Sequence, residues 1–551
     1  MFSSDNSIGR AGQAAIAVCL LAVILLLQWR GGAYGAEPAT QGDEAAHVVT
    51  GLMVHDYLVS GKRGNPMRYA ENYYLHYPQV ALGHWPPVFY GVQALWMLAI
   101  PPSRTAILLL LAFLAAVICF RVFQVTARAA PWPAAFASAL LLAMLAPMQQ
   151  YTRLILAEML LTWLTLEATL AFAGWLAVPR ASASVRFGLW SAAAILTKAT
   201  GAGIAFLPLA AILLGRRFRL FAKPSLWIAA LIVLALCVPW YVYAPGARHE
   251  ANLPMGGLIG VGAVEAGAGL PSVTMALPLE DLWYRLRASL RAIPILFNWL
   301  GPAFLLIAWA LLAGARRRDP LAMATLGLLS AFLIFRLIMM AATIHERLLL
   351  PVLPPLLFFL WQGCELLRPR VKPGLTLAMA GVMMTAWSFY RIEPKRAVGI
   401  QEVTQSLLAR PEFRDSVFML CSDANTEGAL IAEIALHDQP RPQHYVLRSS
   451  KVMASSLWNG QKYQAKFHST EEVLKLIQET PVGVLIVDNR PTIPVKHLPL
   501  LEETIRQFPD QFRAQVVPGG RFRVYEIEGH RGRPRKKLTL SIPALGRSLA
   551  E

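Results

Sequence analysis

Charged residues are scarce in this chain of 551 residues, where they make up 15% of the sequence, against roughly a quarter in an average soluble domain. Acidic residues are the scarcest, with 33 Asp and Glu against 51 Lys and Arg. Only five cysteines occur, four of them in apolar runs, which excludes a disulfide-stapled scaffold. No internal repeat is found. These shortages argue against a soluble enzyme and exclude a disordered or collagen-like chain.

Hydrophobic residues make up 56% of the chain and gather in runs long enough to cross a bilayer. Nine of these runs are clear. A further run, 187–214, is too long for one helix and is interrupted at 197–201, so we expect two short helices there. The net charge of +18 is better explained by basic cytoplasmic loops than by nucleic-acid binding. An all-α polytopic membrane protein with about eleven transmembrane helices is predicted. The nine clear runs are 14–29, 104–123, 133–148, 159–178, 225–243, 295–313, 321–340, 348–366 and 374–390.

The distribution of Lys and Arg predicts which loops share a side of the membrane. With basic loops inside, the N-terminus lies inside and the C-terminus outside. In the first outer loop we expect helices at 43–58 and 86–100 that lie at the interface, because a further crossing at 86–100 would invert every later loop. The segments predicted to face outward are 31–103, 149–158, the turn at Lys198, 244–298 and 343–347.

The composition changes near residue 391, where short apolar runs and amphipathic segments replace the long hydrophobic ones. A soluble α/β domain is therefore expected, with strands at 417–421, 482–487 and 522–527 and helices at 427–436, 470–479 and 500–508. No Gly-rich phosphate loop opens any of these helices. The predicted organisation is a transmembrane domain at 1–390, the α/β domain at 391–530 and a basic tail at 531–551.

Two acidic sites are candidates for catalysis. Asp43 and Glu44 follow the first membrane helix, and His47 lies four residues after Asp43 on the same helical face. A carboxylate there either acts as a general base toward a hydroxyl or simply caps the helix. Glu158 begins a span, where ionisable groups are costly and tend to be functional, unless it only marks the interface beside Arg153. Glu158 and His47 are also candidate ligands of a divalent cation.

Basic and aromatic residues on the predicted outer side suit a phosphate and a sugar. Lys198 interrupts an apolar run, Arg347 begins a late span, and His84 precedes a Pro-Pro pair. Each is a donor for phosphate. The alternatives are snorkelling for Lys198, pairing with Glu346 or a headgroup for Arg347, and an interfacial role for His84. The candidate substrate-lining residues are His47, Tyr73, Tyr74 and Trp85.

Taken together, these residues resemble the GT-C superfamily of integral-membrane glycosyltransferases, in particular the bacterial protein-mannosyltransferase and aminoarabinose-transferase group. The resemblance covers residues 11–391 in order and spacing. It implies that Asp43 of the Asp-Glu pair is the base and that Glu158 is the second acidic residue. Lys198 and Arg347 match donor-phosphate contacts, although the glycine after Lys198 is delayed to Gly201. In addition, Trp85 separates His84 from Pro-Pro, and Leu348 replaces a tyrosine.

The resemblance implies an inverting glycosyltransferase of the bacterial inner membrane, with its active site and C-terminal domain on the periplasmic side. The implied donor is a polyprenyl-phosphate sugar, and the acceptor is a lipid, a protein or a glycan. A divalent metal ion is the one cofactor considered. A transporter or flippase would also need polar residues within helices, although it more often places them near the bilayer midplane. A noncatalytic membrane scaffold is the second alternative.

Overall fold

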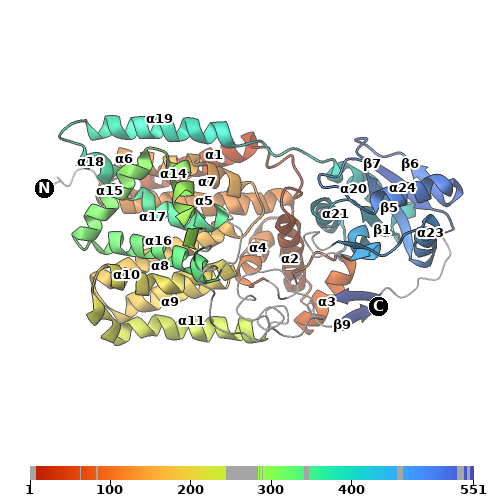
Figure 1. Ribbon diagram of the computed structural model, residues 1–551, viewed down its shortest axis with the longest axis horizontal. Coiled ribbons are helices and arrows are strands. Elements are labelled where there is room, and N and C mark those ends of the chain that lie inside the picture. Colours follow the sequence, from red (N-terminus) through yellow and green to blue (C-terminus); the bar gives the residue numbers. More distant parts are fainter. Residues whose placement is uncertain are drawn as a thin grey trace.

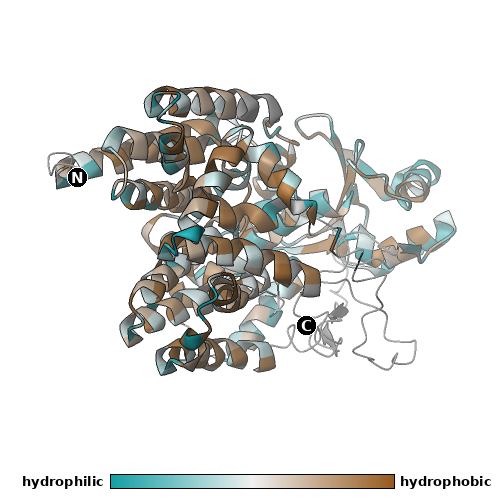
Figure 2. Ribbon diagram, turned by 60° about the vertical axis from the view of Figure 1, so that its left-hand side comes forward, coloured by the Kyte–Doolittle hydropathy of each residue, from teal (hydrophilic) through white to brown (hydrophobic). Residues whose placement is uncertain are grey.

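The computed structural model describes residues 8–61, 64–81, 83, 85–243, 283, 286–287, 290–339, 346–455, 463–529, 539–542 and 547–550. A helical bundle occupies one end of the elongated molecule and an α/β domain the other (Figure 1). Hydrophobic residues dominate the bundle, whereas hydrophilic ones concentrate in the C-terminal domain (Figure 2). This division follows the change in composition near residue 391.

Every run that is predicted to cross the membrane contains helical structure. Among the described residues, four helices are long and apolar enough to cross a membrane, and three bent helix pairs raise the number to seven. Shorter helices occupy the remaining predicted crossings. The bundle helices are α1 (Arg10–Arg30), α5 (Arg104–Thr126), α6 (Trp132–Met144), α7 (Ala146–Thr152), α8 (Glu158–Ala177), α9 (Ala181–Ile195), η2 (Ala199–Phe206), α10 (Leu207–Leu214), η3 (Phe218–Ala222), α11 (Pro224–Tyr243), α14 (Ala292–Leu300), α15 (Ala303–Arg316), α16 (Pro320–Met339), η5 (Glu346–Val352), α17 (Leu353–Leu357), α18 (Leu360–Leu366) and α19 (Pro373–Arg391).

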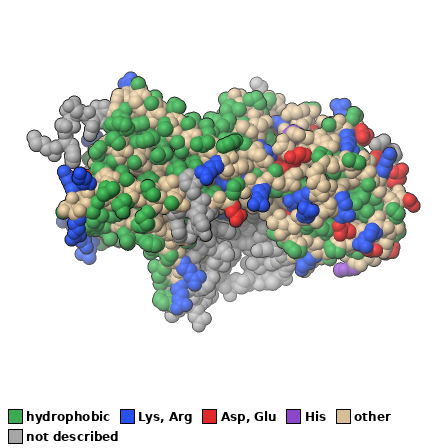
Figure 3. All heavy atoms as spheres, turned by 90° about the horizontal axis from the view of Figure 1, so that it is seen from above, with side chains coloured by type: hydrophobic (Ala, Val, Ile, Leu, Met, Phe, Trp, Pro, Cys, Tyr) green, Lys and Arg blue, Asp and Glu red, His purple; other side chains and the backbone are tan. Residues whose placement is uncertain are grey.

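The outside of the bundle is apolar, as a lipid-facing surface requires. Leu231 on α11, Leu305 on α15 and Val382 on α19 have exposed fractions of 66%, 64% and 69%. Figure 3 shows hydrophobic side chains spread over the helical part, with basic ones at its far end, while most of the acidic side chains in view lie over the C-terminal domain. A soluble protein would rarely leave so continuous an apolar surface uncovered. The structure therefore confirms the polytopic membrane fold that hydropathy predicts.

The interrupted run at 187–214 forms two helical pieces, as its sequence predicts. Helix α9 ends at Ile195, and Lys198 has an extended backbone before η2 begins. Gly201 lies so close to the end of α9 that an added Cβ would sit 2.5 Å from the carbonyl oxygen of Ala194. Glycine is needed at this approach because any side chain would collide with backbone. The delayed glycine thus serves the return of the chain at the Lys198 turn.

Three helices lie in the loop between α1 and α5 that is predicted to face outward. Helices α2 (Gly42–Val59) and α4 (Val88–Ala99) stand between the bundle and the C-terminal domain, and α3 (Pro66–His76) lies below that domain (Figure 1). Both helices expected in this loop are thereby confirmed. A capping box closes the start of α2, in which Gln41 and Glu44 satisfy each other's backbone N–H groups. Asn65 caps α3 and is followed by a proline at its first position. Helix α2 thus begins firmly at the turn that carries Asp43.

The C-terminal domain contains a five-stranded sheet of order β2-β1-β5-β7-β6. The first three strands are parallel, and β7 and β6 pair antiparallel at one side. All three predicted strands and all three predicted helices are present. Within the predicted basic tail at 531–551, residues 539–542 and 547–550 form two paired antiparallel strands, and the basic run at 531–537 lies outside the described residues. The elements are α20 (Ile400–Leu408), η6 (Pro411–Phe413), β1 (Val417–Cys421), α21 (Ala424–His437), β2 (Tyr445–Arg448), α22 (Ser449–Val452), β3 (Ala454–Ser455), β4 (Gln464–Ala465), α23 (Thr470–Glu479), β5 (Val482–Asp488), α24 (Leu498–Gln507), η7 (Pro509–Gln511), β6 (Phe512–Gln515), β7 (Phe522–Ile527), β8 (Thr539–Ile542) and β9 (Arg547–Ala550).

Polar contacts attach this domain to α2, to the residue after α3 and to the start of α5. Arg441 forms an ion pair of 2.8 Å with Asp56 near the end of α2. The hydroxyl of Tyr77 donates a hydrogen bond of 2.5 Å to Asp438. Arg104, the first residue of α5, pairs with Glu433 at 2.8 Å. The domain is therefore fixed against α2, the helix that also carries Asp43.

Candidate functional site

Four charged residues from distant parts of the chain converge at one place. Arg347 Nη1 lies 3.0 Å from Asp43 Oδ2. Lys198 Nζ lies 2.5 Å from Glu158 Oε1, and Arg347 Nε lies 3.7 Å from the same oxygen. Two carboxylates and two cations therefore form a single connected cluster, which we call the charged cluster. Its formal charge is balanced before any ligand binds.

Each member of the charged cluster sits where a secondary-structure element begins or breaks. Asp43 lies in the first turn of α2, and Glu158 is the first residue of α8. The positive end of a helix dipole favours a carboxylate at both positions. Lys198 occupies the break between α9 and η2, and Arg347 follows the first residue of η5. Such positions leave side chains free to point beyond the bundle instead of into helix contacts.

The charged cluster is buried but keeps unused hydrogen-bonding capacity. Glu158 has an exposed fraction of 2%, and its Oε2 has no hydrogen-bond partner among the described residues. The side chains of Asp43, Lys198 and Arg347 remain 14%, 18% and 19% exposed. A buried oxygen without a partner is costly, so its persistence points to a ligand or water that binds there.

The charges around Asp43 determine its ionisation. Burial alone would raise the pKa of the Asp43 carboxyl, but the Arg347 guanidinium and the Lys198 ammonium hold this pKa below its ordinary value. Asp43 is consequently ionised at neutral pH while it is paired with Arg347. Removal of the guanidinium from this pair would raise the pKa of Asp43 and strengthen it as a base.

His47 lies one helical turn after Asp43 and belongs to an aromatic group. Its Nδ1 is 2.8 Å from the hydroxyl of Tyr90, and its ring stacks on Trp85 at a centroid distance of 4.4 Å. Burial lowers the pKa of His47 to about 4, so the imidazole is neutral at pH 7. An aromatic surface therefore lies directly beside the charged cluster.

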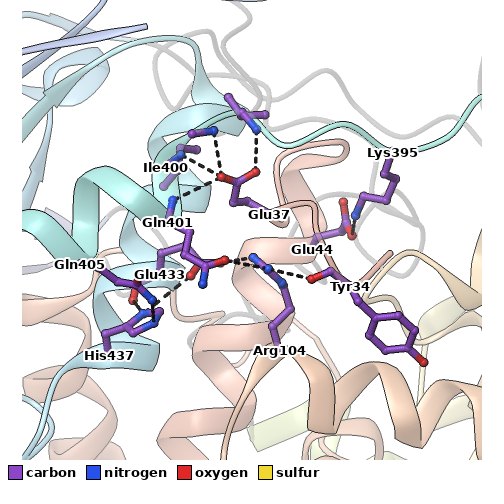
Figure 4. A network of polar contacts seen from close by, with 12 residues as sticks. Tyr34, Glu37, Glu44, Arg104, Lys395, Ile400, Gln401, Gln405, Glu433 and His437 are labelled. Carbon is purple, nitrogen blue, oxygen red and sulfur yellow. Dashed lines mark hydrogen bonds and ion pairs between the residues drawn. The ribbon is translucent and has the colours of Figure 1, made fainter. Parts of the chain in front are cut away.

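Glu44, the neighbour of Asp43, binds Lys395 and the backbone of Ile155. Its Oε1 accepts a hydrogen bond of 2.9 Å from Lys395 Nζ (Figure 4). The same oxygen accepts one of 3.1 Å from the backbone N–H of Ile155. The sequence analysis did not identify Lys395, since it lies beyond the last predicted span with no motif around it. Its role depends on a contact over 351 positions, which local patterns do not reveal.

The two tyrosine candidates, Tyr73 and Tyr74, lie on α3, a helix that contacts the C-terminal domain. The Tyr73 hydroxyl donates to Asp56, the partner of Arg441, and burial raises the pKa of Tyr73 well above its ordinary value. Tyr74 is half-buried, and loss of water around its hydroxyl raises its pKa. The remaining candidate, His84, lies outside the described residues.

The described residues do not fit a divalent metal ion. Among them, no group of three or more His, Cys, Asp or Glu side chains could hold one. Of the two predicted ligands, Glu158 binds Lys198 through Oε1, and His47 binds Tyr90 through Nδ1. Cations of the protein itself occupy the positions next to the carboxylates, so no step is assigned to a metal.

No protein-family model matches the chain, and no curated protein is similar to it in sequence. Similarity appears in three dimensions. ArnT from Cupriavidus metallidurans bound to undecaprenyl phosphate superposes with a TM-score of 0.57, at 13% identity, over 96% of this chain and 100% of that one. The same protein in the apo state gives a TM-score of 0.56 at 14% identity, over 94% and 99%.

The oligosaccharyltransferase of Archaeoglobus fulgidus, in complex with Zn and sulfate, is more distant, with a TM-score of 0.48 at 11% identity over 86% of this chain and 68% of that one. The likeness to ArnT, along nearly the whole length of both chains, shows that the chain has the GT-C fold that its sequence resemblance predicts. At this level of identity the comparison shows the fold, so the chemistry must be argued from the charged cluster.

Proposed function

We propose that this protein is a membrane glycosyltransferase that moves a sugar from a polyprenyl-phosphate carrier to an acceptor hydroxyl. The observation that carries the proposal is the charged cluster, in which Asp43 and Glu158 meet Lys198 and Arg347. A reaction that releases a phosphate and deprotonates a hydroxyl requires both kinds of group at one place. The likeness to ArnT, crystallised with undecaprenyl phosphate, supports the same donor class.

Asp43 is the proposed base. The acceptor oxygen attacks the anomeric carbon from the face opposite the phosphate, and the bond from that carbon to the phosphate oxygen breaks with inversion. The electron pair leaves with the polyprenyl phosphate, while the acceptor proton passes to Asp43. The low pKa of Asp43 beside Arg347 keeps the carboxylate free of a proton before the reaction.

Arg347 and Lys198 are proposed to change partners as the donor binds. Each cation is paired with a carboxylate, at 3.0 Å and 2.5 Å. The donor phosphate is a diester with one negative charge, which grows toward two as the bond to the sugar breaks, and the arginine fork suits its oxygens. When Arg347 turns toward the phosphate, the pKa of Asp43 rises and the carboxylate becomes a better base. Donor binding thereby activates the base that deprotonates the acceptor.

Glu158 is proposed to hold a substrate hydroxyl. Its Oε2 has no partner among the described residues although it is buried. A sugar or acceptor hydroxyl that donates to this oxygen would remove the cost of leaving it unpaired. The stacked pair of Trp85 and His47 provides an apolar face beside it.

The proposed location is the bacterial inner membrane, with the charged cluster and the C-terminal domain on the periplasmic side. The basic turn at 367–372, between α18 and α19, is predicted to be cytoplasmic and lies at the end of the bundle opposite the C-terminal domain (Figure 1), as the rule for positive loops requires. A polyprenyl-phosphate donor needs no nucleotide on that side, because its activated bond is already present. Only its headgroup has to enter the site, while the chain stays in lipid.

Transfer of a labelled sugar by the purified protein tests the proposal. Polyprenyl-phosphate sugars would be supplied with lipid, peptide and glycan acceptors. We expect Asp43→Asn to lower turnover by at least about 10³-fold, since the base is lost. Asp56→Asn is the matched control, because Asp56 lies on the same helix and pairs with Arg441 instead of a cluster cation.

Unchanged transfer in Asp43→Asn would eliminate Asp43 as the base. Movement of the intact donor across a vesicle membrane, without cleavage of its glycosidic bond, would favour a flippase instead.

A further inference from the structure

A buried ion pair joins the helix of Asp43 to the connection between the bundle and the C-terminal domain. Lys395 lies in the segment between α19 and α20, and its Nζ is 2.9 Å from Glu44 Oε1. Their side chains are 7% and 0% exposed. Because removal of two charges from water is expensive, such a pair has to compensate through good geometry and further hydrogen bonds.

Those further bonds reach the segment that leads to Glu158. Glu44 Oε1 accepts the backbone N–H of Ile155, three residues before Glu158. Lys395 Nζ also donates to the carbonyl oxygen of Arg153 at 3.4 Å. One ammonium group therefore contacts both the first turn of α2 and the bent segment that leads into α8. These are the two elements that carry the acidic residues of the charged cluster.

The backbone of Lys395 is held just as closely. Its N–H donates to the carbonyl oxygen of Gly31 at 2.9 Å, an oxygen that also accepts from Arg153 Nη1. Gly32 has a φ of +72°, and a Cβ there would lie 2.4 Å from the carbonyl oxygen of Lys395. Glycine is thus required where the two segments cross. Arg153 also donates to the carbonyl oxygen of Glu393 at 3.1 Å.

The same segment is fixed on its C-terminal side. Glu37 accepts hydrogen bonds of 2.7 to 3.2 Å from the backbone N–H groups of residues 398–401, where α20 begins. Arg104 then bridges Gln401 and Glu433 of the C-terminal domain (Figure 4). A continuous set of polar contacts runs from that domain through Lys395 to Glu44, the neighbour of Asp43.

We infer that Lys395 is a positioning residue, which sets the placement of Asp43 relative to Glu158 and makes it depend on the docked C-terminal segment. The inference rests on the proposed function, because it assigns Lys395 a role in that reaction. Loss of the ammonium would leave the Glu44 carboxylate buried without its cation, and the first turn of α2 would shift to reach water. A shift of about 1 Å in a reacting group is enough to lower turnover by about 100-fold.

Lys395→Met tests the inference, since methionine keeps the length and removes the charge. We expect kcat to fall by roughly 10- to 100-fold while KM for the polyprenyl-phosphate sugar changes by less than about threefold. Lys395→Arg should recover part of the loss. The double variant Lys395→Met with Glu44→Gln should be more active than Lys395→Met alone, because no unpaired charge is then buried.

Arg441→Met is the matched control, because it breaks a similarly buried ion pair that ties the C-terminal domain to the other end of α2. We expect it to lower the melting temperature but to keep the wild-type kcat. If Lys395→Met keeps the wild-type kcat, or if Arg441→Met loses as much, the inference is overturned while the proposed function stands. If the wild type transfers no sugar, the proposed function fails and the inference fails with it. If Asp43→Asn stays active, Asp43 is not the base, and the inference is overturned while sugar transfer stands.

Discussion

The bundle and the C-terminal domain each bury a group of charged side chains, and among the described residues the two groups differ in the hydrogen-bonding capacity that the central carboxylate leaves for a ligand. In the C-terminal domain, Glu427 has an exposed fraction of 0% and binds Arg448 at 3.0 Å. It also accepts from the side chains of Ser449 and Ser450 and from the backbone N–H of Ser450. In the charged cluster, by contrast, Glu158 keeps one buried oxygen without a partner among the described residues.

The buried residues around Glu427, which we call the C-terminal group, include a serine beside a histidine. Ser449 Oγ lies 2.7 Å from His497 Nε2, and Tyr463 Oη lies 2.8 Å from His497 Nδ1. The Ser449 hydroxyl, however, already donates to Glu427 at 3.1 Å, so its proton is not available to His497. Burial of charge alone therefore does not identify an active site. Unused hydrogen-bonding capacity next to partly exposed cations is the more telling feature.

The acidic residues at the ends of β1 and β5 are a second example of buried charge without free hydrogen-bonding capacity. Asp423 caps α21 and accepts the N–H of Thr492, while Asp488 binds Arg521 and Ser422. Strand ends of this kind can host ligands in α/β sheets. Here their oxygens are fully engaged by the protein, so these residues stabilise the domain.

Glu427→Gln should separate the two groups most strongly. It leaves Arg448 buried without its counter-charge, and we expect the C-terminal domain to lose about 3–5 kcal/mol of stability. Sugar transfer per folded molecule should be unchanged. Chemical denaturation followed by the fluorescence of the full-length protein measures the first quantity. A loss of turnover without a loss of stability would mean that the C-terminal group takes part in the reaction.

Arg347→Met should have the opposite effect, a lower turnover with little change in stability. We expect a loss of roughly 10²–10³-fold in kcat, because the charge that develops on the leaving phosphate is no longer stabilised. Steady-state kinetics with a polyprenyl-phosphate sugar provide the measurement, and the melting temperature provides the control. The distinction between the two groups would be wrong if this variant had a lower melting temperature but kept the wild-type kcat.

Acid should destabilise the C-terminal group through His497, whose pKa burial lowers from 6.5 to about 4. The unfolded chain takes up this proton first as the pH falls, so the stabilising contribution is complete above pH 6.5 and is lost between 6.5 and about 4. We expect a loss of about 2 kcal/mol between roughly pH 7 and pH 5. His497→Gln, which cannot be protonated, should flatten this dependence in thermal melts; an unchanged slope would assign the acid sensitivity to other groups.

The smallest effect is expected at a solvent-exposed ion pair. Arg506 and Glu503 on α24 are 3.0 Å apart, with side chains 73% and 40% exposed. Arg506→Ala should change the stability by less than about 1 kcal/mol, since water and salt already screen both charges. A larger change in the same denaturation experiment would show that a short distance, rather than burial, sets the energy of ion pairs in this domain.

Local patterns predicted the elements of this fold well because each depends on near neighbours in sequence. The break at Lys198, the helix after Asp43 and the strands of the C-terminal domain all follow from hydropathy, helix starts and alternation. Individual residues of the charged cluster also stood out, since a charge beside an apolar run is rare. Lys395 and Glu37 did not, because their partners are hundreds of residues away.

Composition and periodicity by themselves determined that this chain is a bundle of apolar helices followed by a mixed domain, since the partition of side chains between lipid and water is a property of each segment. Only the tertiary structure decided that Asp43 meets Arg347, that Glu158 meets Lys198, and that Glu44 is held by Lys395. Ion pairs of this kind act over a few ångströms, so they form only after packing has brought the segments together.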